Sequence, residues 1–181
     1  MLYLRDNDSS EIFSIMSKPI RDDGEYIIEH GFGYTEYSHR YNNINGRVKV
    51  FVPHDEKMKV LIVNLQNLGE KTAHISLSYY AQVVMGTAYE ENNNFIYTDI
   101  DEENGYICAS NIATPFWNGE KMYLSILNGK KSSFTGDRME YIGDEGDISY
   151  PKAMKFKRLS GKSGFNDPCL SEMCSVEIKS G

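Results

Sequence analysis

Asp137 and Arg138 stand side by side in the run FTGDRMEYIG, which covers residues 134–143. Most of their neighbours are apolar, and Gly136 and Gly143 are residues that favour turns. An arginine guanidinium offers five N–H donors in a fixed planar arrangement, and a neighbouring carboxylate can orient it. The pair can therefore hold a loop together or bind a ligand with several acceptor groups. The local sequence leaves both interpretations open.

The histidines and cysteines show no spacing that indicates a metal site. The four histidines form neither an HxH nor an HExxH motif, and the three cysteines include no CxxC pair. A His and a Glu on a β-sandwich could perform acid–base chemistry on a sugar ring, with His30 and His39 as candidates. An ordinary polar strand residue is the competing interpretation of each histidine. We expect Cys108, Cys169 and Cys174 to be free thiols in a reducing compartment.

A period of two in the apolar residues predicts the elements that must position these side chains. In GRVKVFVP, Val48, Val50 and Val52 share one face, and residues 75–83 alternate in the same way, with one face on a core. The run KVLIVNLQN (59–67) is apolar on both faces, which predicts a central strand covered on both sides. Turn signals recur at short intervals, at 42–46, 67–71, 101–105 and 117–121. The sequence predicts an all-β, largely antiparallel sandwich or barrel.

A length of 181 residues, of which 40% are hydrophobic, suffices for one domain with a substantial core or at most two small ones, and we expect a single domain, 1–181. Residues 144–173 show little alternation and are interpreted as a long irregular loop region. Long ordered loops on a rigid sheet scaffold are often functional.

The formal net charge of −7 argues against a nucleic-acid partner, because such a partner requires a positive footprint. The N-terminus lacks the pattern of a signal peptide, and the longest aliphatic run, 60–63, is too short to cross a membrane. We therefore expect a soluble, cytoplasmic chain without a membrane segment. A basic cluster follows an acidic run, and we expect the two to compensate each other on a solvated face. The cluster comprises Lys152, Lys155, Lys157, Arg158 and Lys162, and the run comprises Asp137, Glu140, Asp144, Glu145 and Asp147.

Four stretches occur together in one order: YLRDN (3–7), the segment from HGFGYT to VVMG (30–86), TGDRMEYIG (135–143) and LSGKSGFNDPC (159–169). They resemble the N-terminal β-sandwich of glycoside hydrolase family 94 over nearly the whole chain. That family contains cellobiose, chitobiose and β-1,2-oligoglucan phosphorylases and the phosphorylase-like part of cyclic β-1,2-glucan synthases. The resemblance is strongest to the cyclic glucan synthase branch, through YLRD, HGFGYT and the ending LSG…DPC.

The resemblance implies a β-supersandwich of the galactose mutarotase-like kind, also described as a glycosyltransferase 36-associated domain. In the family a helical linker and an (α/α)6 barrel follow, and the barrel carries the general-acid aspartate and the phosphate site. The reaction is inverting phosphorolysis of a β-glucoside, or its reversal as glucosyl transfer, without a metal or an organic cofactor. The chain begins inside the family's sandwich and ends before its final strand. We therefore expect a fragment with an incomplete sandwich and no catalytic residue.

The resemblance also implies a role for the charged pair. The stretch TGDRMEYIG matches the family's Asp-Arg-x-x-aromatic-x-Gly segment, whose arginine can reach bound sugar. Arg138 is thus the main candidate for a substrate contact, with Asp137 orienting it and Tyr141 as the aromatic residue of the segment. Trp117, beside Phe116, is a candidate stacking surface for sugar or a packing residue. The implied partners are a β-glucan or oligosaccharide, the (α/α)6 catalytic domain, and a second subunit in a homodimer or other self-association.

The function implied is a non-catalytic, carbohydrate-associated domain of a β-glucan phosphorylase or related glycosyltransferase, which contributes to the dimer interface and to loops on the substrate side. A parent of the cyclic glucan synthase kind would be membrane-associated. A free-standing carbohydrate-binding module is the alternative, because the chain has 13 tyrosines and a lone tryptophan. A mutarotase-like sugar epimerase that uses a His and a Glu is a lower alternative, since no such pair stands out by spacing.

Overall fold

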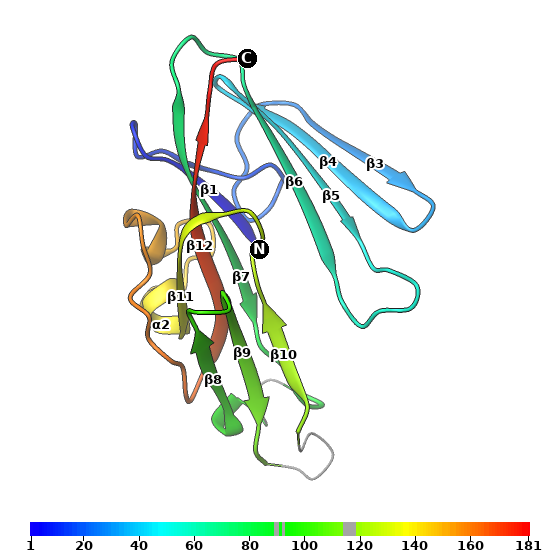
Figure 1. The fold of residues 1–181 in the computed structure, drawn as a ribbon, viewed down its shortest axis with the longest axis vertical. Coiled ribbons are helices and arrows are strands. Elements are labelled where there is room, and N and C mark those ends of the chain that lie inside the picture. Colours follow the sequence, from blue (N-terminus) through cyan, green and yellow to red (C-terminus); the bar gives the residue numbers. More distant parts are fainter. Residues whose placement is uncertain (89–90, 92, 114–118) are drawn as a thin grey trace. The chain divides into compact units, whose positions relative to one another are not determined.

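Strands are the main regular structure of the chain in the computed structural model, which describes residues 1–88, 91, 93–113 and 119–181 (Figure 1). Three short helices occur among these residues: η1 (Asn93–Phe95), α2 (Arg138–Tyr141) and η3 (Lys152–Lys155). The strands are β1 (Leu2–Asp6), β2 (Ile12–Phe13), β3 (Tyr26–Gly31), β4 (Tyr34–Tyr41), β5 (Ile44–Phe51), β6 (Val60–Asn67), β7 (Ala73–Gln82), β8 (Ile96–Asp101), β9 (Tyr106–Asn111), β10 (Lys121–Leu124), β11 (Lys130–Asp137) and β12 (Pro168–Ile178).

The chain divides into two compact units. The first contains Met1 and residues 76–176, and the second contains residues 2–75 and 177–181. Strands β7 and β12 each have residues in both units. The strand pairs β3–β4, β4–β5, β5–β6, β8–β9, β9–β10 and β11–β12 are antiparallel, so the predicted all-β, antiparallel supersandwich is confirmed. The prediction of a single domain over 1–181 stays a prediction.

The second unit is built around a four-stranded antiparallel sheet in the order β3-β4-β5-β6, whose strands lie side by side in Figure 1. The alternation predicted for Val48, Val50 and Val52 is confirmed only in part: Val48 is buried with Ile44 and Gly46, but Val50 is half-buried, and Val52 lies beyond β5 and is 64% exposed. The turn predicted around 42–46 joins β4 to β5, with Asn42 in the left-handed region at φ 50°. Strand β1 pairs with β2 in the same unit.

The prediction that 59–67 forms a central, doubly covered strand is wrong. Strand β6 stands at the end of the four-stranded sheet, and Ile62 is 45% exposed. The register places Ile62 in one row with Lys49, Glu36 and Glu29, on the face of the sheet that carries charged side chains. The apolar residues on both faces of this strand therefore did not indicate that both faces are covered by other elements.

The first unit contains two sheets, one with the order β10-β9-β8 and one in which β11, β12 and β7 are neighbours. The turn predicted at 101–105 forms the β8–β9 hairpin, with Gly105 at φ 72°. A hydrophobic core draws residues from both sheets and their flanks, as in a sandwich. It comprises Val83, Met85, Ile96, Ile107, Ala109, Phe134 and Leu170.

Strand β7 differs from its prediction in being buried on both faces. Ser76 and Ser78, on the face expected to be solvated, are fully buried. Ser78 Oγ lies 2.8 Å from the Tyr141 hydroxyl and donates to the Glu172 carbonyl oxygen at 3.0 Å. Small hydroxyls can be buried in this way because each finds a hydrogen-bond partner. The segment that follows β11 therefore covers this face.

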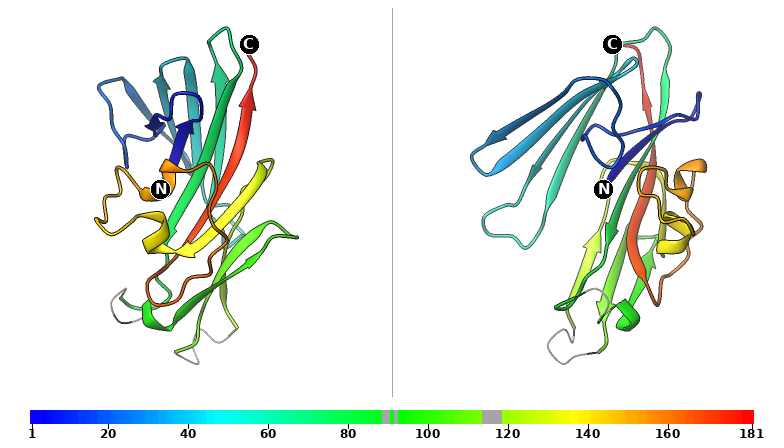
Figure 2. Two further views of the ribbon diagram at one scale, coloured as in Figure 1. Left: turned by 90° about the vertical axis from the view of Figure 1, so that its left-hand side faces the viewer. Right: turned by 180° about the vertical axis from the view of Figure 1, so that it is seen from behind.

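The irregular region ends at residue 167 and not at 173, because β12 begins at Pro168. Residues 168–174 are all buried, and a strand buried on both faces shows no alternation in its sequence. The remaining excursion, 138–167, is drawn in yellow to orange beside β11 in Figure 2. No helix among the described residues has the length and apolar character needed to cross a membrane.

Candidate functional site

Asp137 ends β11 and begins α2, so the predicted loop contains a single helical turn. Its Oδ1 accepts a hydrogen bond from the Glu140 backbone N–H at 3.1 Å, which is an N-cap contact. Its Oδ2 forms an ion pair with Lys162 Nζ. Burial alone would raise the pKa of the Asp137 carboxyl, but the hydrogen bonds from Lys162 and from the Glu140 N–H outweigh burial and lower that pKa.

Arg138 contacts a different carboxylate from the one predicted. Its Nη1 donates to Asp167 Oδ2 at 3.2 Å, and both side chains are 27% exposed. Arg138 also hydrogen-bonds the hydroxyl of Tyr80. Burial raises the pKa of Asp167 in spite of the neighbouring cation, so we read the pair as a positioning contact and not as a large source of stability. Asp167, and not Asp137, therefore orients the guanidinium.

Tyr141 lies in the core and not at a sugar-accessible surface. Its side chain is fully buried, and its ring packs on that of Tyr80 with centroids 4.9 Å apart. Burial is the main cause that raises the pKa of Tyr80 to about 12. The predicted substrate contact by Tyr141 is therefore wrong. Tyr141 is the last residue of α2, and its buried ring anchors this helix in the core. Trp117 and Phe116 lie outside the described residues.

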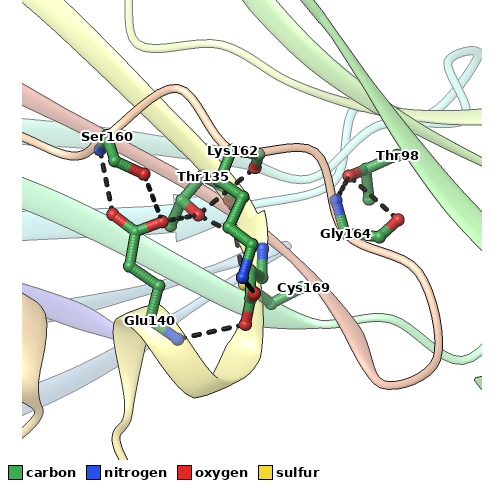
Figure 3. A network of polar contacts seen from close by, with 8 residues as sticks. Thr98, Thr135, Glu140, Ser160, Lys162, Gly164 and Cys169 are labelled. Atoms are coloured by element: carbon green, nitrogen blue, oxygen red, sulfur yellow. Dashed lines mark hydrogen bonds and ion pairs between the residues drawn. The ribbon is translucent and has the colours of Figure 1, made fainter.

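Glu140 ties the far end of the excursion to α2 (Figure 3). Its Oε1 accepts from the Ser160 backbone N–H at 2.9 Å, and its Oε2 accepts from Ser160 Oγ at 2.7 Å and from Thr135 Oγ1. Residues 159–164 also form backbone hydrogen bonds along β11. Gly161 N–H donates to the Phe134 carbonyl at 2.9 Å, and Gly136 N–H donates to the Lys162 carbonyl at 2.7 Å.

Two glycines allow this segment to approach the sheet closely. A Cβ placed on Gly164 would lie 1.7 Å from the Gly136 carbonyl oxygen, and one on Gly136 would lie 1.7 Å from Thr98 Oγ1. Because neither residue has a Cβ, Thr98 Oγ1 can accept from the Gly164 N–H at 2.6 Å. Both positions require glycine for space and not for a positive φ.

A shallow hollow of about 330 Å³ opens between α2 and the 159–164 segment. The carboxylates of Asp137 and Glu140 on its wall are already bonded to Lys162, Ser160 and the backbone. These two carboxylates are therefore engaged by contacts within the fold. The hollow is lined by Asp137, Met139, Glu140, Asp144, Lys152, Ser160 and Lys162.

The described residues favour neither a metal site nor the mutarotase alternative. They contain no cluster of His, Cys, Asp or Glu side chains that could hold a metal ion. His39 is buried, with Nδ1 2.9 Å from the Glu25 carbonyl oxygen and Nε2 3.0 Å from Asp22 Oδ2, so a sugar cannot reach its ring. His30 Nδ1 faces Thr35 Oγ1 at 3.1 Å and not a glutamate.

Sequence reasoning missed Asp167 and Ser160 as partners of the charged segment, whereas Lys162 belongs to the basic cluster that was expected to compensate the acidic run containing Asp137. All three stand 20 to 29 positions from the residues they bind, in a stretch without periodicity. The signal that could have pointed to this segment is local. Asn166 and Asp167 both adopt positive φ, of 57° and 85°, just before Pro168, so NDP marks a sharp turn.

Comparison with known proteins places this geometry in a family. A model for the supersandwich domain of glycosyl hydrolase 94 matches residues 1–181. N,N'-diacetylchitobiose phosphorylases of Vibrio proteolyticus and Vibrio furnissii are 25% and 24% identical over 168 and 171 residues, which are 90% of this chain and 21% of each relative. Solabiose phosphorylase of Paenibacillus borealis is 25% identical over 152 residues, covering 82% of this chain and 20% of the relative.

The chain therefore spans about a fifth of the length of these curated relatives. The predicted resemblance is confirmed at the level of the family, while its strongest likeness to the cyclic glucan synthase branch stays a prediction. The full-length match, the antiparallel strands and the capped Asp-Arg segment lead to one conclusion. The chain belongs to the glycosyl hydrolase 94 family and corresponds to its supersandwich domain.

Proposed function

We propose that this chain is the non-catalytic, carbohydrate-associated domain of a glycoside phosphorylase that acts on an oligosaccharide, with α2 and its flanking loop on the substrate side. The family match and the phosphorylase names of the relatives support this proposal. The catalytic machinery, in this proposal, belongs to an (α/α)6 domain of the same enzyme. The three cysteines are free and buried, which fits a reducing, cytoplasmic location.

The observation that carries the proposal is that the Arg138 side chain is partly exposed and held in place by Asp167. The Arg138 side chain is 27% exposed, and Asp167 fixes its guanidinium through Nη1. A guanidinium has five donors, so donors remain for the hydroxyls of a sugar. Fixing the side chain in advance lowers the entropy cost of binding. Asp167 thus acts as a positioning residue for a substrate contact.

The test is Arg138→Ala in the full-length enzyme that contains this domain. A hydrogen bond from a charged donor contributes about 1.5–3 kcal/mol, so we expect the KM for the sugar acceptor to rise by about tenfold or more with little change in kcat. Arg138→Lys should restore only part of the affinity, because an ammonium cannot reproduce the planar donor set. Lys157→Ala, an exposed cation of the same excursion, is the matched control.

Two outcomes would overturn this assignment. An unchanged KM in Arg138→Ala would show that the guanidinium contacts no sugar. A lowered thermal midpoint of the domain, with kinetics restored at low temperature, would show that Arg138 only holds the loop.

We also propose that this domain contributes to a homodimer interface. The support is an exposed strand at the end of a sheet: β3 stands at one end of the four-stranded sheet, and Ile27 and Ile28 on it are 48% and 45% exposed. Unpaired strand edges favour pairing with another chain.

A further inference from the structure

The outer face of the β10-β9-β8 sheet carries a group of aromatic rings. The antiparallel register places Tyr97 beside Ser110 and Lys121, and Asp99 beside Cys108 and Tyr123. Side chains of paired residues point to the same face, and alternate rows point to opposite faces. The rows between these, with Ile96, Thr98 and Ile107, point into the core. Tyr97, Tyr106, Tyr123 and Phe165 form the group that we call the aromatic face.

Phe165 adds one more ring to this face, next to the end strand β8. It forms an isolated antiparallel bridge with Tyr97, so the two rings stand side by side on the same surface. The preceding residue, Gly164, fixes this placement through hydrogen bonds to Thr98, and Figure 3 shows the two that involve the Thr98 hydroxyl. The loop bound by Glu140 therefore delivers an aromatic ring to the edge of a different sheet.

The rings of the aromatic face lie across the sheet and are open to solvent. Phe165 is 58% exposed, Tyr97 is 39% exposed and Tyr123 is 62% exposed. Cys108 and Ser110, on the same face, are only 3% and 8% exposed.

Local contacts hold the rings in place. Tyr106 and Tyr123 meet edge to face, with centroids 5.4 Å apart and an interplanar angle of 74°. The Tyr106 hydroxyl also hydrogen-bonds the Asp101 carboxylate, which Asn104 holds from its backbone N–H at 2.9 Å and from Nδ2 at 2.8 Å. A binding surface that is already fixed loses little entropy when a ligand arrives.

The composition of this face suits a carbohydrate. Aromatic rings pack against the C–H faces of pyranoses, and tyrosine adds a hydroxyl at the rim. Asp99 and Lys121 are exposed beside the rings and provide an acceptor and donors for sugar hydroxyls. The paired rows of Tyr97 and Tyr123 contain no Leu, Ile, Val or Met, while the exposed Ile112 (65%) follows directly after β9, with its N–H on the Phe95 carbonyl at 3.1 Å. From Phe165 to Tyr123 the sheet spans three strand spacings, about 14 Å, which fits a short oligosaccharide.

We propose that the aromatic face is a binding surface for a β-linked oligosaccharide, separate from the Arg138 contact. Tyr97, Tyr123 and Phe165 stack on successive sugar rings, while Asp99 and Lys121 bond their hydroxyls. The surface would hold an extended chain on the enzyme without taking part in the reaction. It also gives the carbohydrate-binding alternative a location in this chain.

Calorimetric titration of the 181-residue chain with cellopentaose and with a β-1,2-linked glucopentaose tests the surface. We expect at least one of the two sugars to bind with a millimolar or lower Kd. Tyr97→Ala and Tyr123→Ala should each weaken binding by about fivefold or more, because each removes one stacked ring. Tyr97→Phe should keep most of the affinity. Phe156→Ala, which removes an equally exposed ring (57%) in the excursion, should leave the Kd unchanged.

Three results would overturn the inference. One is a titration without heat for both sugars at millimolar concentration, repeated by NMR shift mapping. Another is equal affinity in the wild type and both alanine variants, with folding verified by circular dichroism. The third is a wild-type dimer that Tyr123→Ala converts to a monomer, which would make this face a protein interface. All three leave the Arg138 kinetics in the full-length enzyme untouched, so this inference and the proposed function can fail separately.

Discussion

Adjacent charged residues in this chain serve unrelated partners. Asp137 caps α2 and pairs with Lys162, while Arg138 pairs with Asp167. The reason is local geometry, because an N-cap residue is extended and the next residue is helical, so their side chains diverge. The sequence could select the pair as unusual, but not its partners, since these come from a loop region without periodicity.

Glu172 is a second residue whose role only the structure reveals. It stands in β12 with 1% exposure, and its Oε2 accepts from the Ile126 backbone N–H at 2.7 Å. Its Oε1 has no hydrogen-bond partner among the described residues. Burial raises the pKa of Glu172 above the usual value of 4.5, against the opposing hydrogen bonds from Ser132 and Ile126. The protonated form is therefore the one that the fold favours.

This burial predicts that stability falls as the carboxyl ionises. With a raised folded-state pKa, the contribution of Glu172 is fully present below pH 4.5 and is lost as the pH rises through the folded value. Glu172→Gln cannot ionise and keeps an oxygen for the Ile126 N–H. We expect its thermal midpoint to exceed that of the wild type at pH 7, with the difference shrinking toward pH 4. Parallel melts of both proteins across this range, with exposed Glu145→Gln as control, measure the effect; identical pH profiles would contradict it.

At the scale of elements, the 159–164 segment acts as an added edge on β11. Its backbone hydrogen bonds to Phe134 and Gly136 continue the sheet, and it carries Phe165 to β8. The close approach depends on two facing glycines at 136 and 164. Sequence reasoning identified Gly136 only as a residue that favours turns and did not single out Gly164, because the residue type alone does not show whether a glycine is needed for a turn or for the absence of a Cβ.

Gly164→Ala tests this arrangement. The new Cβ would lie 1.7 Å from the Gly136 carbonyl oxygen, which belongs to the backbone and cannot rotate away. We expect a loss of about 2 kcal/mol or more in the free energy of unfolding, as for other overpacked sites. Ser163→Ala, at an exposed neighbouring position, should change stability by less than about 0.5 kcal/mol. Urea unfolding of the three proteins decides the matter, and equal midpoints would refute the close contact.

The errors in strand prediction share one cause. Alternation reports which face of a strand is polar, not which face is covered. Strand β7 alternates but is buried on both sides, because Tyr141 and the Glu172 backbone satisfy the hydroxyl of Ser78. Strand β6 is apolar on both sides and stands at the end of its sheet. Coverage is decided by segments far away in the sequence, and no local pattern contains them.

At the scale of the whole molecule, the all-β class and several hairpin turns could be predicted, because both depend on neighbouring residues. The family followed from four motifs in order, and the match over residues 1–181 confirms it. The substrate contact of Arg138 stays a prediction, Tyr141 lies buried in the core, and the residues that position them could not be found from the sequence. Long-range partners require the fold.

The exposed strand at the end of the four-stranded sheet has consequences for the assembly of the chain. Strand β3 has six residues, and its one partner within that sheet is β4. Ile27 shares its row with Ser38 and Arg47 on one face, and its side chain is 48% exposed. A six-residue strand with free N–H and C=O groups and exposed isoleucines is a template for pairing with a second copy.

We therefore expect the chain to self-associate reversibly, with a weight-average sedimentation coefficient that rises with concentration. Ile27→Lys places a charge beside the free edge, where natural proteins use lysine against edge-to-edge pairing, and should keep the chain monomeric. Its thermal midpoint should stay close to that of the wild type, because Ile27 is half exposed. Tyr150→Lys adds the same charge at an exposed position (56%) of the first unit and should not prevent association. A wild-type chain that sediments as one monomer at every concentration would show that β3 is protected without a partner.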